Sequence, residues 1–120
     1  MAQFCVPTRR FLRDIEGVST DFVLSAYDDR VVVVATQIGT VGTVLQASPE
    51  TALDGSVTFG VSVLLGRRDQ EELLLCARRI VDGASKTGCR RPLIICLGLK
   101  SPTMATVKGI IETILEDPIW

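Results

Sequence analysis

The sequence predicts an α+β fold, with a six-stranded antiparallel sheet and two helices in one domain that spans residues 1–120. Three observations lead to this prediction. Residues 8–64 alternate between apolar and polar side chains in short runs that turn residues separate. From residue 69 onward, apolar positions recur every three or four residues in two stretches, with one short apolar run between them. A chain of 120 residues with 47% apolar side chains suits a single hydrophobic core.

Five strands are expected ahead of the first helix, in the order of a meander. Gly17 and the Asp28-Asp29 pair mark the first two turns, because glycine and aspartate favour turn conformations. Residues 30–38, RVVVVATQI, form the most β-branched run and are therefore expected in the central strand. The segment 48–56, SPETALDGS, is expected to be a polar loop. The five strands are predicted at residues 8–16, 20–27, 30–38, 43–47 and 57–64.

Helical spacing begins near residue 69. Asp69 and Glu72 have the spacing of a capping box, in which two side chains satisfy free backbone donors at the start of a helix. Gly88 is a stop signal, so the first helix is expected over residues 69–86. Its buried stripe consists of Leu73, Ala77, Ile80 and Ala84.

A short strand and a second helix close the predicted order of elements. Residues 92–98, PLIICLG, form a wholly apolar strand. Ser101 as the cap and Pro102 at the first helical position start the second helix, and Pro118 ends it. The buried stripe of this helix consists of Met104, Val107, Ile110, Ile111, Ile114 and Leu115.

The charge balance and the lack of histidine exclude several functions. The chain has 13 Lys and Arg residues, 14 Asp and Glu residues and a net charge of -1, so no basic excess is present to hold nucleic acid or an anionic membrane. Without histidine, Ser-His and Cys-His nucleophile pairs, histidine general bases and the usual zinc ligands are excluded. We therefore expect no enzyme, and no catalytic residue, cofactor or metal site.

The four cysteines, at positions 5, 76, 89 and 96, show no C-x-x-C spacing, which argues against a zinc knuckle or a thioredoxin-type pair. The sequence has neither a secretion signal nor an apolar run of the roughly 18 residues that a membrane span needs. We therefore expect a reduced, intracellular protein in the cytoplasm, with the nucleus left open. The alternative is a thiol-dependent enzyme that uses Cys5 or Cys89. For Cys89, the positive charges of Lys86, Arg90 and Arg91 would favour the reactive thiolate.

Four adjacent arginine pairs are spread along the sequence. They would form a basic patch for an acidic partner if the fold brings them together. Nearby acidic residues such as Asp69 and Asp82 make a surface of mixed charge an equal alternative. The pairs are Arg9-Arg10, Arg67-Arg68, Arg78-Arg79 and Arg90-Arg91.

The two faces of the predicted sheet need more cover than two helices provide. Six strands at about 4.8 Å spacing form a sheet roughly 24 Å wide, and two helices of about 10 Å diameter cover one face of it. In residues 30–38 and 92–98, apolar side chains point to both faces. A second sheet packed on the uncovered face would bury it, which predicts a homo- or heterodimer with a β-sandwich interface. The alternative is a monomer with one helix on each face.

Alternation leaves two candidate sets of residues for the dimer face. One set contains the odd-numbered residues of 31–35, and the other contains the even-numbered residues of 32–36. We choose the second set because it includes Thr36 and neighbours Ser25 and Gln46, and a face between subunits tolerates more polar groups than a domain core. The predicted interface residues are Val23, Val32, Val34, Thr36 and Val44.

Several strings of residues carry a resemblance to a known family. They are G-V-x-T at 17–20, V-V-V-A-T-Q-I-G-x-x-G-T at 32–43, VLLG at 63–66, ARRIV at 77–81 and the closing Trp120. On these residues the chain, from about Glu16 to its end, resembles the proteasome assembly chaperone 3 family. The resemblance implies a six-stranded antiparallel sheet with two helices.

The resemblance also implies a function. It implies a non-catalytic assembly chaperone that pairs with a second similar subunit, of the proteasome assembly chaperone 4 kind, and promotes assembly of the 20S proteasome α-ring from its α-subunits. We expect a homodimer when the partner is missing, and no binding to nucleic acid or membrane. The alternative is a small roadblock- or longin-like adaptor module that scaffolds another complex, although such modules usually place a helix between or before their early strands.

For contact with the α-subunits, the loop 48–56 is favoured, since long exposed loops on a rigid sheet often carry recognition. A mobile spacer without contacts is the alternative. The predicted contact residues are Pro49, Glu50, Thr51, Leu53, Asp54 and Gly55.

Overall fold

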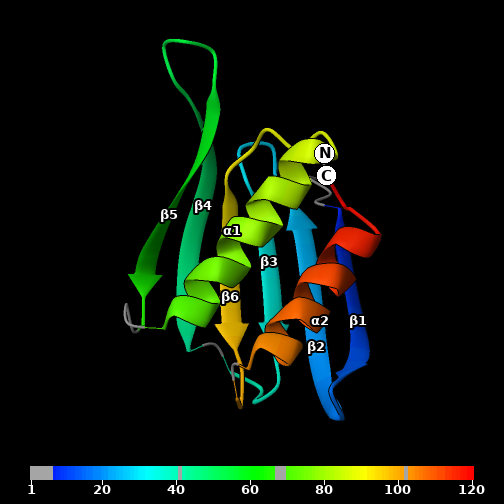
Figure 1. The fold of residues 1–120 in the computed structure, drawn as a ribbon. Helices are drawn as coiled ribbons and strands as arrows, with labels where there is room; N and C mark the ends of the chain where they lie inside the picture. Colours follow the sequence, from blue (N-terminus) through cyan, green and yellow to red (C-terminus); the bar gives the residue numbers. More distant parts are fainter. Residues whose placement is uncertain (1–6, 41, 67–69, 102) are drawn as a thin grey trace.

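Both helices lie on one face of a six-stranded sheet in the computed structural model of the chain (Figure 1). The structure describes residues 7–40, 42–66, 70–101 and 103–120. The expected α+β class, with six strands and two helices, is confirmed. In chain order the elements are β1 (Thr8–Ile15), β2 (Val18–Ala26), β3 (Val31–Thr36), β4 (Thr43–Thr51), β5 (Val57–Leu65), α1 (Glu71–Lys86), β6 (Leu93–Gly98) and α2 (Met104–Glu116).

The sheet is not a simple meander, because its strand order is β1-β2-β3-β6-β4-β5. β6 lies between β3 and β4, and it runs parallel to β3 and antiparallel to β4. The expectation of a wholly antiparallel sheet is therefore wrong for this one pair. The reason is that β6 is apolar on both faces, so burial stabilises it most in a middle position. α1 supplies the crossover that brings the chain back from β5 to β6 in the same direction.

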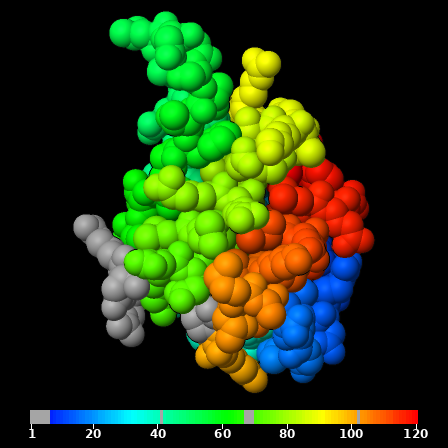
Figure 2. Space-filling model, viewed as in Figure 1, coloured from blue at the N-terminus to red at the C-terminus, as the bar shows by residue number. Residues whose placement is uncertain are grey.

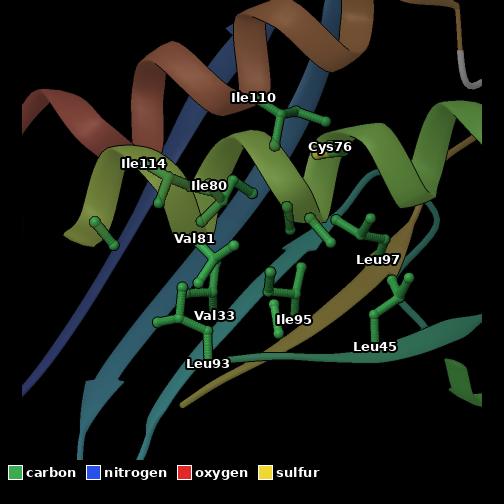
Figure 3. Close-up of a cluster of buried hydrophobic side chains, with 14 of the residues drawn as sticks. Val33, Leu45, Cys76, Ile80, Val81, Leu93, Ile95, Leu97, Ile110 and Ile114 are labelled. Atoms are coloured by element: carbon green, nitrogen blue, oxygen red, sulfur yellow. The ribbon is translucent and has the colours of Figure 1, made fainter. Parts of the chain in front are cut away.

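The hydrophobic core lies between the helices and one face of the sheet (Figure 3). In β3, Val31, Val33 and Ala35 are fully buried, whereas the residues between them are only half-buried. Ile80 of α1 and Ile110 of α2 point toward this buried layer. The alternative with one helix on each face of the sheet is therefore wrong.

The second helix begins later than the sequence suggests. Thr103 is its N-cap, and the Thr103 side chain accepts a hydrogen bond from the Thr106 backbone N–H at 3.3 Å. Ser101 is therefore not the cap, and Pro102 lies outside the described residues. Both cap candidates carry a hydroxyl group near the helix start, so the residue types alone do not separate them. Asp69, the predicted cap of α1, also lies outside the described residues.

β4 and β5 form a long hairpin whose tip projects beyond the rest of the sheet (Figures 1 and 2). The pairing continues up to Thr51, which lies opposite Val57. The predicted loop 48–56 is therefore wrong over its first part, and only residues 52–56 connect the two strands. Three of the predicted contact residues thus belong to β4, namely Pro49, Glu50 and Thr51.

Pro49 lies within β4, and a proline at this position makes the sequence of the segment resemble that of a loop. The Ala52 N–H donates a hydrogen bond to the Ser56 carbonyl oxygen at 2.8 Å. Because bonded positions alternate along an antiparallel pair, the Pro49 nitrogen points away from β5. On that side β6 begins only opposite Ala47, so the missing N–H of the proline costs no ladder hydrogen bond.

Candidate functional site

The candidate functional surface is the sheet face that neither helix covers, which we call the open face. It includes all five residues of the predicted dimer interface, and each of them is only half-buried. The competing set of residues in β3 lies under the helices and is fully buried, so it is not available for contact. The central residues of the open face are Val23, Val32, Val34, Thr36, Val44, Ile94 and Cys96.

Strand register aligns part of the open face into an apolar row. Val34 of β3 is paired with Val23 of β2 on one side and with Cys96 of β6 on the other. Cys96 is in turn paired with Val44 of β4. Since neighbouring strands lie about 4.8 Å apart, these four side chains form a continuous apolar strip across the middle of the sheet.

A second row runs beside the first and ends in polar groups. Val32 of β3 is paired with Ile94 of β6. Ser25 of β2 stands at one end of this row, and Gln46 of β4 stands at the other. An apolar centre with a polar rim is the arrangement of a protein–protein interface.

The predicted interface lacks Ile94 and Cys96, which lie at the centre of the open face. A meander would place β6 at the edge of the sheet, and only its insertion between β3 and β4 brings these side chains to the middle. The signal is nevertheless present in the sequence, because a strand that is apolar on both faces belongs in the interior of a sheet.

The three described free cysteines lie in or beside the apolar layers of the fold. Cys76 is buried, and burial raises the pKa of its thiol to about 12. Burial also raises the pKa of the Cys96 thiol, and a raised pKa disfavours the reactive thiolate. Cys89 is buried, with its Sγ 3.6 Å from the Arg91 carbonyl oxygen, which runs against the expectation of an accessible nucleophile there. Cys5, the other candidate of the thiol hypothesis, lies outside the described residues.

Within residues 7–40, 42–66, 70–101 and 103–120, no group of three or more His, Cys, Asp or Glu side chains is placed to hold a metal ion. In the same part of the chain, no helix has the length and apolar character needed to cross a membrane.

The remaining predicted contact residues lie at the tip of the β4–β5 hairpin. Leu53 is fully exposed. The Asp54 carboxylate accepts hydrogen bonds from the Ser56 hydroxyl at 2.6 Å and from the Ser56 N–H at 2.9 Å, and these bonds lower the pKa of Asp54. The Gly55 N–H donates to the Ala52 carbonyl oxygen at 3.0 Å. The tip is therefore a hydrogen-bonded turn that presents one large apolar side chain to solvent.

Comparison with known proteins places the chain in a family. The sequence profile described as proteasome assembly chaperone 3 matches residues 33–117, which is most of the chain. The chain belongs to the proteasome assembly chaperone 3 family.

Curated relatives and a solved structure agree with this assignment. Proteasome assembly chaperone 3 of Bos taurus is 29% identical over 106 residues, which cover 87% of this chain and 86% of the relative. The protein of the same name from Homo sapiens is 26% identical with the same coverage. A structure described as a novel chaperone complex for yeast 20S proteasome assembly matches the fold with a TM-score of 0.69, over 88% of this chain and 93% of that chain. Its sequence identity is 9%, so it supports the fold alone, whereas the family indicates a proteasome assembly chaperone.

Proposed function

We propose that this member of the proteasome assembly chaperone 3 family uses its open face to pair with a second chaperone of similar fold, of the proteasome assembly chaperone 4 kind. The pair binds α-subunits of the 20S proteasome and promotes their assembly into a ring, without catalysing a reaction. The proposed location of this activity is the cytoplasm, together with the nucleus.

The observation that carries the proposal is the apolar row of the open face. Its four residues lie in the middle of the sheet, yet no helix covers them. A second sheet, packed about 10 Å away on the open face, would bury the apolar row between the two sheets. The similar yeast structure is described as a chaperone complex, which supports a pair over a single chain. Without the partner, the same face would pair two copies of this chain.

The hairpin tip supports a second contact, with the α-subunits. It projects away from the body of the sheet (Figure 1), so it stays accessible when the open face is occupied. Leu53 at the tip is fully exposed, and the turn that carries it is held by hydrogen bonds. We assign the contact to Leu53, Asp54 and Gly55, with Pro49, Glu50 and Thr51 of the adjoining strand.

Two single substitutions separate the two contacts. The chain is co-expressed with a chaperone-4-like subunit, and the purified pair is mixed either with isolated α-subunits or with finished 20S particles. Val34→Glu places a carboxylate in the apolar row and should abolish co-purification of the partner, because burying an unpaired charge costs several kcal/mol. Leu53→Asp should leave pairing intact and weaken binding of the α-subunits.

The wild-type pair is expected to bind free α-subunits and not finished particles. A wild-type pair that binds no α-subunit would contradict the proposed function. Partner binding by Val34→Glu that is as tight as wild type would contradict the role of the open face. Thermal unfolding of both variants, compared with wild type, serves as the folding control.

A further inference from the structure

An apolar groove separates the two helices, on the side of the sheet opposite the open face. α1 and α2 lie side by side across this side of the molecule (Figure 2). The groove between them has a volume of about 380 Å³. Met104 at the start of α2 lines the groove and is 56% exposed, although its spacing in the sequence predicts a buried position. The apolar floor consists of Leu75, Met104, Val107 and Ile111.

The groove lies on the N-terminal side of a close contact between the two helices. Gly83 of α1 approaches Leu115 of α2 so closely that an added Cβ would collide with the leucine side chain. Just beyond α1, the Trp120 indole N–H donates a hydrogen bond to Thr87 Oγ1 at 2.8 Å, which holds the end of the chain against the end of α1. The residues that line the groove precede Gly83 in α1 and Leu115 in α2. The close approach of Gly83 to Leu115 therefore lies nearer the C-terminal ends of both helices than the groove does.

Positively charged side chains lie on both sides of the groove. Arg79 lies on the α1 side and Lys108 on the α2 side, and both residues are exposed. Neither side chain makes an ion pair with another described residue. Among the described residues of the lining, Glu112 is the one acidic residue. The lining thus carries a net positive charge, and the Arg79 and Lys108 side chains are available to pair with acidic groups of a partner.

The groove continues toward the hairpin. A smaller hollow of about 270 Å³ adjoins it, lined by Phe59 of β5 and by Arg78, and the two share Arg79. The acidic residue of this hollow, Asp82, is already paired with Lys86 at 3.3 Å. A cationic, apolar surface therefore runs from α2 across α1 to the strand that leads from the hairpin tip.

We propose that this groove binds an acidic, amphipathic segment of a proteasome α-subunit. Apolar side chains of the segment fill the floor, and its carboxylates pair with Arg79 and Lys108. The inference rests on the proposed function, and it places the α-subunit on the helical side of the sheet while the open face holds the partner chaperone. The concave shape suits a segment of a protein better than a flat lipid surface.

Reversal of charge on both sides of the groove tests this proposal. The double variant Arg79→Glu, Lys108→Glu is purified in the pair with its partner chaperone. The matched control is Arg90→Glu, Lys100→Glu, which makes the same change in net charge at exposed residues outside the groove lining. The dissociation constant for an isolated α-subunit is measured by biolayer interferometry at low and high salt.

The groove variant is expected to bind the α-subunit at least about tenfold more weakly, because two charge pairs are lost and replaced by repulsion. The control variant is expected to stay close to wild type. High salt should weaken wild-type binding toward that of the groove variant, since salt screens exposed charges. Met104→Asp, a second variant, places a carboxylate on the exposed floor and is also expected to weaken binding without a loss of pairing.

The outcomes separate this proposal from the proposed function. If wild type and both groove variants bind the α-subunit equally well, the proposal is overturned and the proposed function stands. If the wild-type pair binds no α-subunit, both are overturned. Binding to phosphatidylserine-containing vesicles that disappears in the groove variant, with unchanged binding to the α-subunit, would assign the groove to a membrane and also overturn the proposal.

Discussion

The end of β6 shows how closely single residues are packed where strands meet. A Cβ on Gly98 would collide with the Thr40 carbonyl oxygen and would lie 2.9 Å from Thr36 Oγ1. Thr36 Oγ1 in turn donates a hydrogen bond to the Thr40 carbonyl oxygen at 2.7 Å. The turn that follows β3 therefore lies directly against β6, and only glycine leaves room for it.

Gly98→Ala is expected to lower the free energy of unfolding by about 1–3 kcal/mol, because overpacking at this point forces the backbone to move. Gly42→Ala is the matched control in the same turn. A Cβ on Gly42 would lie 3.9 Å from the Leu97 carbonyl oxygen, which is an ordinary contact. Urea denaturation measures both variants, and equal midpoints would contradict the close packing described for Gly98.

The reactivity of the Cys96 thiol shows whether the open face is covered. Its thiol lies in the apolar row, so pairing through this face should protect it from Ellman's reagent, whereas a chain kept monomeric by Val34→Glu should react. Burial raises the pKa of Cys96, so labelling should accelerate as the pH rises toward that pKa and the thiolate fraction grows. Cys76, with a pKa of about 12, should stay unlabelled in the native protein.

Mass spectrometry of the labelled cysteines, in the Val34→Glu monomer and in the wild-type pair, tests this prediction. Equal labelling of Cys96 in both states would show that the open face is not covered in the pair. The alternation along β3 made this face predictable from the sequence, and Thr36 indicated which side is not under the helices. The role of Gly98 was not predictable, because its contact with Thr40 depends on which strand β6 joins.

Among the helices, α2 offers the clearest test of a cap. The Thr103 hydroxyl accepts a hydrogen bond from the Thr106 N–H, while the exposed Ser101 lies outside the helix. Thr103→Ala is expected to lower the free energy of unfolding by about 1 kcal/mol, and Ser101→Ala should change it by less than about 0.5 kcal/mol. Thermal unfolding of the two variants decides between them, since a larger loss for Ser101→Ala would show that the cap lies there.

Local patterns fix where the strands and helices lie, and distant pairings fix their order. The strand predicted at residues 20–27 is observed at Val18–Ala26, because alternation is a property of the segment itself. The end of β4 was missed because Pro49 is typical of loops, and only the free edge beyond Ala47 makes it acceptable in a strand. The two-sided apolar character of β6 indicates an interior position, but the identity of its neighbours, β3 and β4, depends on pairings far away in the sequence, which no local pattern contains.

The whole molecule is predicted to associate through its open face. Light scattering after size-exclusion chromatography of the isolated chain should give a mass near twice 13.0 kDa. Val34→Glu should give a mass near 13.0 kDa, because the carboxylate would be buried between the two sheets. Leu53→Asp, which changes the distant hairpin tip, should keep the mass of the wild-type chain. A wild-type chain that stays monomeric at high concentration would contradict the prediction.

The uncovered face could be predicted from the sequence, because two helices cover only one face of a six-stranded sheet and the central strands are apolar on both faces. The structure adds that both helices lie on the same side, and that a groove with Arg79 and Lys108 in its lining lies between them. The groove was not predictable, since Arg79 and Lys108 are distant in sequence and come together only because α1 and α2 lie beside each other in the fold.

The late position of β6 in the sequence affects how the chain is made. β3 and β4 are not paired with each other in the finished sheet, and within the sheet β6 is the strand that links β1–β3 to β4 and β5. During synthesis, both halves leave the ribosome before the strand that connects them. Until it arrives, the facing edges of β3 and β4 are open to pairing with other nascent chains. We therefore expect this chain to be most prone to wrong association before β6 has left the ribosome.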